Sequence, residues 1–149
     1  MKHCLYRRLA IGIALGLCLT GKSSAQSSAP YVEGPVWEIS MVKAKYGLED
    51  DYFNNLRATL KAPLDEAKEK KIILDYKILF GEAASPNDYN IMLLLEFKNM
   101  ASFDNLRDRL DPIFAKAAGS VEGQTQVQVK RLDVREVIGE KVMREITLK

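Results

Sequence analysis

The segment from residue 72 to residue 97 holds two apolar runs separated by a linker of turn-forming residues. The first run ends at Phe80, the second begins at Ile91, and the linker between them contains Gly, Ser, Pro, Asn and Asp. In both runs, apolar side chains recur at every second position, as they do along one face of a β-strand. The segment therefore predicts a β-hairpin with one apolar face and one mixed face, the mixed face carrying Asp75, Lys77, Leu79, Met92, Leu94, Glu96 and Lys98.

The residues before this hairpin predict one strand and one helix. Residues 36–46 alternate like a strand whose two faces are both partly buried. From residue 48 to about residue 70, apolar side chains recur every three or four positions, which indicates an amphipathic helix. Pro63 lies inside this pattern and should kink the helix or split it near Ala62, because proline lacks the amide hydrogen.

The residues after the hairpin predict a second helix and a last strand. Asn99 or Ser102 can cap this helix, Gly119 can end it, and the Asp-Pro pair at 111–112 should break or restart it. The pattern at 121–138 fits a strand in part and a helix in part, and we favour a helix that ends at Gly139. Residues 141–148 alternate as a strand.

The first 25 residues have the three parts of a secretory signal peptide. Lys2, Arg7 and Arg8 form a basic start, residues 9–19 form an apolar run, and Ala25 ends a small-residue cleavage motif. The run of 11 residues is shorter than the roughly 20 that a membrane-spanning helix needs. We expect cleavage after Ala25 and export to a bacterial periplasm or medium, with a retained membrane anchor as the competing interpretation.

Cleavage after Ala25 would remove every His and Cys of the chain, namely His3, Cys4 and Cys18. Disulfides, thiolate nucleophiles, His or Cys metal sites and a His-ligated haem are then excluded from the mature protein. The first 25 residues also carry four of the 22 Lys and Arg and none of the 20 Asp and Glu, so the remainder has a formal charge near −2. No basic stripe with aromatic residues is present, and the sequence predicts no nucleic-acid partner.

The order strand, helix, strand, strand, helix, strand is the split βαβ order of ferredoxin-like domains. We therefore expect a single α+β domain over 36–149, preceded by a flexible lead-in at 26–35. Its four-stranded antiparallel sheet should carry helices on one face only. The other face would expose Leu79, Met92 and Leu94 on a monomer, and homodimerisation through that face is the expected remedy.

Three stretches, LDEAKEKKIILDYKIL, SPNDYNIMLLLEFKNMASFD and REVIGEKVMREITLK, carry a resemblance to known proteins. Through them the chain resembles the dimeric α+β barrel superfamily, and most of all its uncharacterised exported bacterial members. NIPSNAP-like and antibiotic-biosynthesis-monooxygenase-type domains are more distantly similar. The resemblance implies two domains whose sheets face each other around a cavity. It implies no single activity, because the superfamily includes quinol-type monooxygenases, haem-degrading enzymes, chlorite dismutases and catalytically silent proteins.

On that model, side chains of the strands are the candidates for lining a ligand cavity. The set consists of Glu38, Ser40, Asp75, Lys77, Met92, Leu94, Glu96 and Glu145, and Lys98 is a further polar residue expected in the cavity or at its rim. Acid–base chemistry needs a carboxylate whose pKa is raised by apolar surroundings, and Glu96, beside Leu94, is the candidate for that role. Cross-strand ion pairs among Glu96, Lys77 and Asp75 are the competing interpretation, and no residue is assigned as catalytic.

Trp37, Tyr76 and Phe97 are either core aromatics or walls of a site for a flat aromatic ligand. The resemblance implies quinols or haem for such a site, although the superfamily's His-assisted haem sites have no counterpart in residues 26–149. We therefore expect a non-catalytic module, without cofactor or metal, that binds a small apolar molecule or another envelope protein. The alternative is a cofactor-independent monooxygenase acting on a quinol-like aromatic substrate, which itself activates oxygen.

Overall fold

The computed structural model describes residues 29–149, and the expected signal peptide with its cleavage site lies outside this range. Along the chain, the elements are strand β1 (Tyr31–Ala44), helices α1 (Glu49–Thr59) and α2 (Lys61–Glu69), strands β2 (Asp75–Phe80) and β3 (Ile91–Phe97), the 3-10 helix η1 (Met100–Phe103), helices α3 (Leu106–Ala118) and α4 (Val121–Arg131), and strand β4 (Arg135–Leu148).

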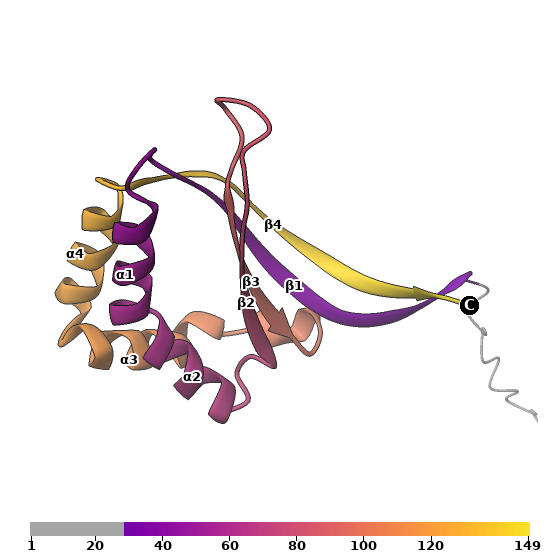
Figure 1. Ribbon diagram of the computed structural model, residues 1–149. Helices are drawn as coiled ribbons and strands as arrows, with labels where there is room; N and C mark the ends of the chain where they lie inside the picture. Colours follow the sequence, from indigo (N-terminus) through magenta and orange to yellow (C-terminus); the bar gives the residue numbers. More distant parts are fainter. Residues whose placement is uncertain (1–28) are drawn as a thin grey trace, which may run out of the picture.

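The four strands form one antiparallel sheet in the order β2-β3-β1-β4. The predicted hairpin is present, with Asp75 opposite Glu96 and Phe80 opposite Ile91. The helices lie together on one face of the sheet, and the other face is open (Figure 1). This strand order with one helical layer confirms the predicted ferredoxin-like α+β fold.

The helices form a ring over the sheet. Helix α1 contacts α2 and α4, and α3 contacts the same two helices from the other side (Figure 1). The long helix predicted before the hairpin is split into α1 and α2 at Leu60, which confirms the effect expected of Pro63. Pro63 itself lies in the first turn of α2, where its missing amide hydrogen leaves no hydrogen bond unmade.

The helix predicted after the hairpin ends where expected, but it is divided near Asp104 and not at Pro112, because η1 ends at Phe103 and α3 begins at Leu106. Asn99 and Ser102 form a capping box on η1, and Gly119 ends α3 with a φ of 83°. However, α3 continues through Asp111 and Pro112 without the expected break. The side chain of Pro112 is exposed, so its ring can be accommodated in α3 without displacing a residue of another element.

The last strand begins earlier than predicted. Residues 121–138 were expected to be helical to Gly139, but α4 ends at Arg131 and β4 begins at Arg135. The reason is a bulge in β4, because Met41 pairs with Gly139 whereas the next residue, Val42, pairs with Val137. This extra residue interrupts the alternation of apolar side chains, so the segment imitates the spacing of a helix.

The first strand also begins earlier than predicted, within the expected flexible lead-in. Residues 31–33 belong to β1 and pair with residues 146–148 of β4. This part of β1 lies beyond the end of β3, so β1 and β4 extend from the body of the molecule as a two-stranded ribbon (Figure 1).

The core between the sheet and the helices consists of two clusters. One gathers around Tyr52, Leu56 and Val42, and the other around Leu64, Ile73, Phe97 and Ile113. Leu60, at the junction of α1 and α2, packs against both clusters. The space between the clusters is the position of the candidate site.

Candidate functional site

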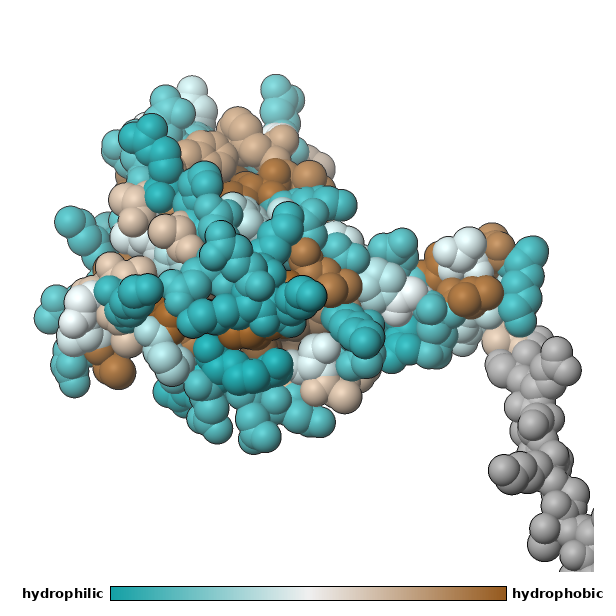
Figure 2. Space-filling view, turned by 90° about the horizontal axis from the view of Figure 1, so that it is seen from below, coloured by the Kyte–Doolittle hydropathy of each residue, from teal (hydrophilic) through white to brown (hydrophobic). Residues whose placement is uncertain are grey.

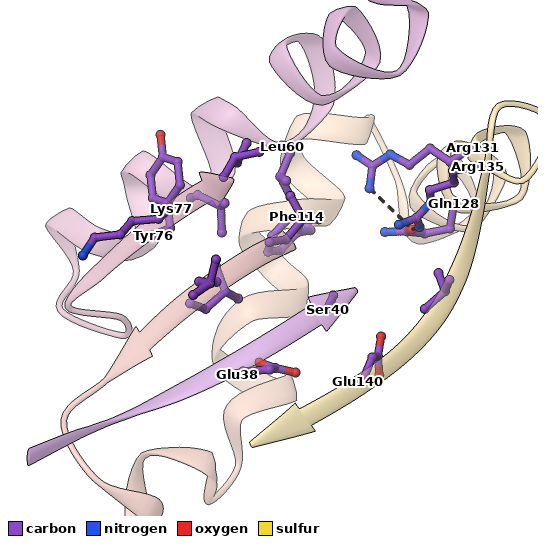
Figure 3. A pocket seen from close by; sticks show the side chains of 16 residues that line it. Glu38, Ser40, Leu60, Tyr76, Lys77, Phe114, Gln128, Arg131, Arg135 and Glu140 are labelled. Atoms are coloured by element: carbon purple, nitrogen blue, oxygen red, sulfur yellow. Dashed lines mark hydrogen bonds between the residues drawn. The ribbon is translucent and has the colours of Figure 1, made fainter. Parts of the chain in front are cut away.

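A pocket of about 200 Å³ lies between the sheet and the helix ring. Its floor is the middle of the sheet face that the helices cover. At the two ends of this face the side chains are fully buried, namely Val36 with its partner Phe97 and Val42 with its partner Ile91. Between these ends, the floor is formed by Glu38, Ser40, Leu93 and Leu95 (Figure 3). The helix face of the sheet is therefore packed at both ends and hollow in the middle.

Glu38 lies on this floor because alternation places it on the same face as Val36 and Val42. Its burial, together with the negative charge of Glu140, raises the pKa of its carboxyl group above the ordinary value. Glu140 lies on β4, opposite Ser40, and lines the same end of the pocket. The two acidic side chains thus form one polar end of the pocket (Figure 3).

Two arginines form the other polar end, away from Glu38 and Glu140 (Figure 3). Arg131 is only 4% exposed, and its Nε donates to Asn55 Oδ1 at 3.0 Å and its Nη2 to Thr59 Oγ1 at 2.5 Å. These bonds join the end of α4 to α1. Arg135 is the first residue of β4, and it donates to the Tyr52 hydroxyl and to Gln128 Oε1, each at 3.3 Å.

Apolar side chains of the helices cover the space between the two polar ends. Leu60, Leu64 and Phe114 face the floor residues Leu93 and Leu95. A second hollow of about 220 Å³ is lined mostly by apolar side chains, with Arg57 and Lys61 among them. It shares Leu60, Leu64, Tyr76 and Ile78 with this pocket and continues toward the β2 edge. The arrangement can hold a small molecule with an apolar body and polar groups at its ends.

The structure divides the predicted cavity residues between the two faces of the sheet. Glu38 and Ser40 face the helices and line the pocket. The others alternate onto the open face, as the register of the strands requires: Asp75, Lys77, Met92, Leu94, Glu96 and Glu145. The predicted set is therefore not one cluster. Lys77 and Leu94 nevertheless also border the pocket, because each lies between two strand residues that line its floor.

On the open face, charged residues surround Trp37. The Lys77 ammonium lies 4.8 Å from the centre of the indole ring, and the indole Nε1 donates to Glu145 at 3.0 Å. Glu96 is opposite Trp37 on β3, and Asp75 pairs with Lys68 of α2 at 2.6 Å. Glu96 forms no ion pair with Lys77 or Asp75 within residues 29–149, so the predicted three-residue charge network is not present there.

The three aromatic residues considered for a flat ligand have separate surroundings. Phe97 is fully buried in the core, where it packs on Phe103. Trp37 lies on the open face, as described above. Only Tyr76 of the three lines the pocket, and its hydroxyl donates to Asp65 at 2.8 Å.

The sequence reasoning missed the apolar lining of the pocket and four of its polar residues, namely Gln128, Arg131, Arg135 and Glu140. A signal for Arg131 was present, because it lies four positions after Val127 and three before Val134, on the apolar stripe of its own segment. A charged residue on such a stripe indicates burial with polar partners.

Within residues 29–149, no cluster of three or more His, Cys, Asp or Glu side chains has the arrangement of a metal site. The same part of the chain contains no helix with the length and hydropathy required to cross a membrane.

Comparison with protein-family models gives no match, and neither does comparison with curated proteins. Solved structures do match. A dimeric ferredoxin-like protein from an uncultured marine organism is 9% identical, with a TM-score of 0.49 over 79% of this chain and 90% of its own. A nipsnap family protein of unknown function from Agrobacterium tumefaciens str. C58 is 18% identical, with a TM-score of 0.48 over 78% of this chain and 90% of its own. A dimeric protein of unknown function with a ferredoxin-like fold, from Bacteroides fragilis NCTC 9343, is 12% identical, with a TM-score of 0.40 over 80% and 100%.

Proposed function

We propose that this protein is a non-catalytic binding module that holds one small, largely apolar molecule in the pocket between the sheet and the helix ring. The observation that carries the proposal is the hollow middle of an otherwise packed sheet face. Protein interiors are close-packed, so a hollow between two core clusters is a costly feature unless a ligand fills it. The absence of His and Cys after residue 18 of the sequence also favours binding over catalysis.

The test is ligand-induced stabilisation measured with 1-octanol as an apolar probe. A ligand that binds the folded state alone raises the melting temperature. We expect 1-octanol to stabilise the wild type but not Leu93→Trp, which fills the pocket floor. Leu79→Trp, on the open face, is the matched control and should respond like the wild type. Equal stabilisation of Leu93→Trp, or none of the wild type, would refute the proposal.

A second candidate function is the cofactor-independent oxidation of a quinol-like aromatic substrate. One observation favours it, namely that burial raises the pKa of the Glu38 carboxyl inside the pocket, as acid–base chemistry requires. Oxygen uptake with a panel of quinols tests this function. Turnover that is lost in Glu38→Gln and kept in Glu96→Gln, on the open face, would establish catalysis in this pocket. No turnover with any quinol would leave binding as the function.

The protein should act as a homodimer joined through the open sheet face. Leu79 and Met143 on this face are 51% and 52% exposed, beside the half-buried Met41, Met92 and Leu94. On the ribbon of β1 and β4, Val32 pairs with Thr147 on this same face and is 55% exposed, whereas Ile146 and Leu148 alternate onto the other face of the ribbon. Figure 2 shows an apolar patch at the far end of the ribbon. A second copy would cover the apolar side chains of the open face.

We expect this binding module to be exported from the cytoplasm, because residues 1–25 have the parts of a signal peptide. Sequencing the N-terminus of the protein from a periplasmic fraction should give Gln26 as the first residue. A first residue of Met1 would refute cleavage and would return His3, Cys4 and Cys18 to the working protein.

A further inference from the structure

The two arginines at one end of the pocket have only neutral partners. Arg131 donates to Asn55, Thr59 and, at 3.5 Å, Gln128, and Arg135 donates to Tyr52 and Gln128. Burial raises the pKa of the Tyr52 hydroxyl, so it stays uncharged. Among the ion pairs of residues 29–149, none involves Arg131 or Arg135.

Both guanidinium groups also keep unused donors. Each guanidinium has five N–H bonds, of which the contacts above occupy three in Arg131 and two in Arg135. The Nε of Arg135 is buried and has no acceptor within the described part of the chain. Buried donors without acceptors and buried charges without counter-charges both cost free energy.

The two positive charges also oppose each other. Burial lowers the pKa of the Arg131 guanidinium, and the positive charge of Arg135 lowers it further. The acidic side chains of the pocket do not relieve this repulsion, because Glu38 and Glu140 stand at its other end (Figure 3). Neither arginine contributes to the change in the Glu38 pKa, which burial and Glu140 cause.

The helix dipole is a competing explanation for one of these charges. Arg131 is the last residue of α4 and bonds to Thr59, the last residue of α1, so it meets the negative ends of two helices. Arg135 lies beyond the end of α4, at the start of β4, and helix dipoles act mainly within the last turn. The guanidinium carbon of Arg135 lies 5.6 Å from the centre of the Tyr52 ring, a neutral cation–π partner. The charge of Arg135 is thus the one that meets neither an acidic side chain nor a helix end within residues 29–149.

We propose that the molecule held in this pocket is an amphipathic anion, whose carboxylate or phosphate head is bound by Arg135 with Arg131 behind it. This inference rests on the proposed binding function and adds the chemical class of the ligand. Arginine is suited to oxyanions, because its planar N–H groups can donate two parallel hydrogen bonds. The apolar body of the ligand lies over Leu93 and Leu95 and continues into the second hollow beside Ile78.

Four probes with the same eight-carbon chain test the head group. Octanoate and octyl phosphate are anionic, 1-octanol is neutral and octylamine is cationic. We expect calorimetry of the wild type near neutral pH to give octanoate or octyl phosphate an affinity about tenfold to a hundredfold above that of 1-octanol, as for charge-assisted hydrogen bonds. Octylamine should bind most weakly. The tighter of the two anions identifies the head group.

One substitution tests the residue, with a matched control in the same region. Arg135→Gln should lower the affinity for the preferred anion about tenfold and leave that for 1-octanol unchanged. Lys130→Gln removes an exposed positive charge of α4 that does not line the pocket, and its affinities should equal those of the wild type. Melting temperatures show whether each variant is folded, and the four-probe comparison in the wild type does not depend on any variant.

The outcomes separate this inference from the proposed function. If the wild type binds 1-octanol as tightly as both octanoate and octyl phosphate, or if Arg135→Gln weakens 1-octanol and the preferred anion alike, the anionic head is refuted and apolar binding stands. If the folded wild type binds none of the four probes, the binding function itself fails. If octylamine binds most tightly, the acidic end with Glu38 and Glu140 determines the ligand, and the assignment of Arg135 is wrong.

Discussion

Glu38 is a carboxylate at a core-facing position of a strand, and this position determines how it affects stability. Burial and Glu140 raise the pKa of its carboxyl group in the folded protein above the unfolded value. In the pH range between the two values, the folded state binds more protons than the unfolded state. The free energy of unfolding should therefore fall as the pH rises through this range.

Replacing Glu38 by Gln removes this titration and keeps the shape of the side chain. We expect Glu38→Gln to be more stable than the wild type at neutral pH, with a difference that shrinks as the pH falls toward the ordinary pKa of an exposed glutamate. Urea unfolding at a series of pH values measures the difference. Glu136→Gln, an exposed change on β4, is the control. A stability gain that does not depend on pH would contradict the explanation.

At the scale of single residues, the sequence predicted which polar residues lie on strands, but it did not predict which of them meet in the pocket. Glu38 and Ser40 share a face with Val36 and Val42, and this alternation could have assigned them to the helix side. The arginines could not be placed in the same way. Arg131 and Arg135 reach the pocket only because α4 packs on α1 and β4 begins four residues after α4 ends, and both facts depend on tertiary structure.

Helix α3 ends at a glycine in the left-handed region, with a φ of 83° at Gly119. A side chain there meets no steric neighbour, but an L-residue in this conformation costs about 1 kcal/mol or more. We expect Gly119→Ala to lower the free energy of unfolding by about 1 kcal/mol, measured by urea denaturation.

Gly81 provides the matched control for this substitution. It also has open space around it, and it does not have a positive φ. Gly81→Ala should change the free energy of unfolding by less than about 0.5 kcal/mol. Equal losses in the two variants would show that backbone conformation does not explain the end of α3.

At the scale of elements, local signals predicted what is decided locally. The split before Pro63 and the end at Gly119 each depend on a few neighbouring residues, and both were confirmed. The cap at Asn99 is present, but it begins the short η1 and not α3. The start of β4 was missed because the bulge near Gly139 follows from pairing with β1, a hundred positions away along the chain. The early start of β1 depends on the same long-range pairing.

The open face of the sheet predicts how the whole molecule assembles. Leu79 is 51% exposed on this face, so Leu79→Lys should leave the monomer folded and introduce a charge into the proposed interface. We expect light scattering at micromolar concentration to give twice the monomer mass for the wild type and the monomer mass for Leu79→Lys.

Val129→Lys is the control for the assembly prediction. Val129 is 59% exposed on α4, outside the open face, and this variant should remain dimeric. A monomeric wild type, or a dimer that survives Leu79→Lys, would contradict assembly through the open face.

The fold of the whole molecule could be predicted from the order of its elements, whereas the pocket could not. The order of strands and helices restricted the chain to one sheet with one helical layer, as observed. The pocket arises where the core divides into two clusters around Leu60, and this division depends on how far the helix ring stands from the middle of the sheet. No short stretch of sequence encodes that spacing.

The most direct test of the binding site uses methyl resonances of Leu and Met during titration with octanoate. Leu60, Leu64, Leu93 and Leu95 line the pocket, whereas Leu79, Met41 and Met92 do not. We predict that the pocket methyl signals shift in proportion to occupancy and that the signals of the other three residues stay in place. Shifts confined to Leu79, Met41 and Met92 would place the ligand on the open sheet face and contradict a site between the sheet and the helices.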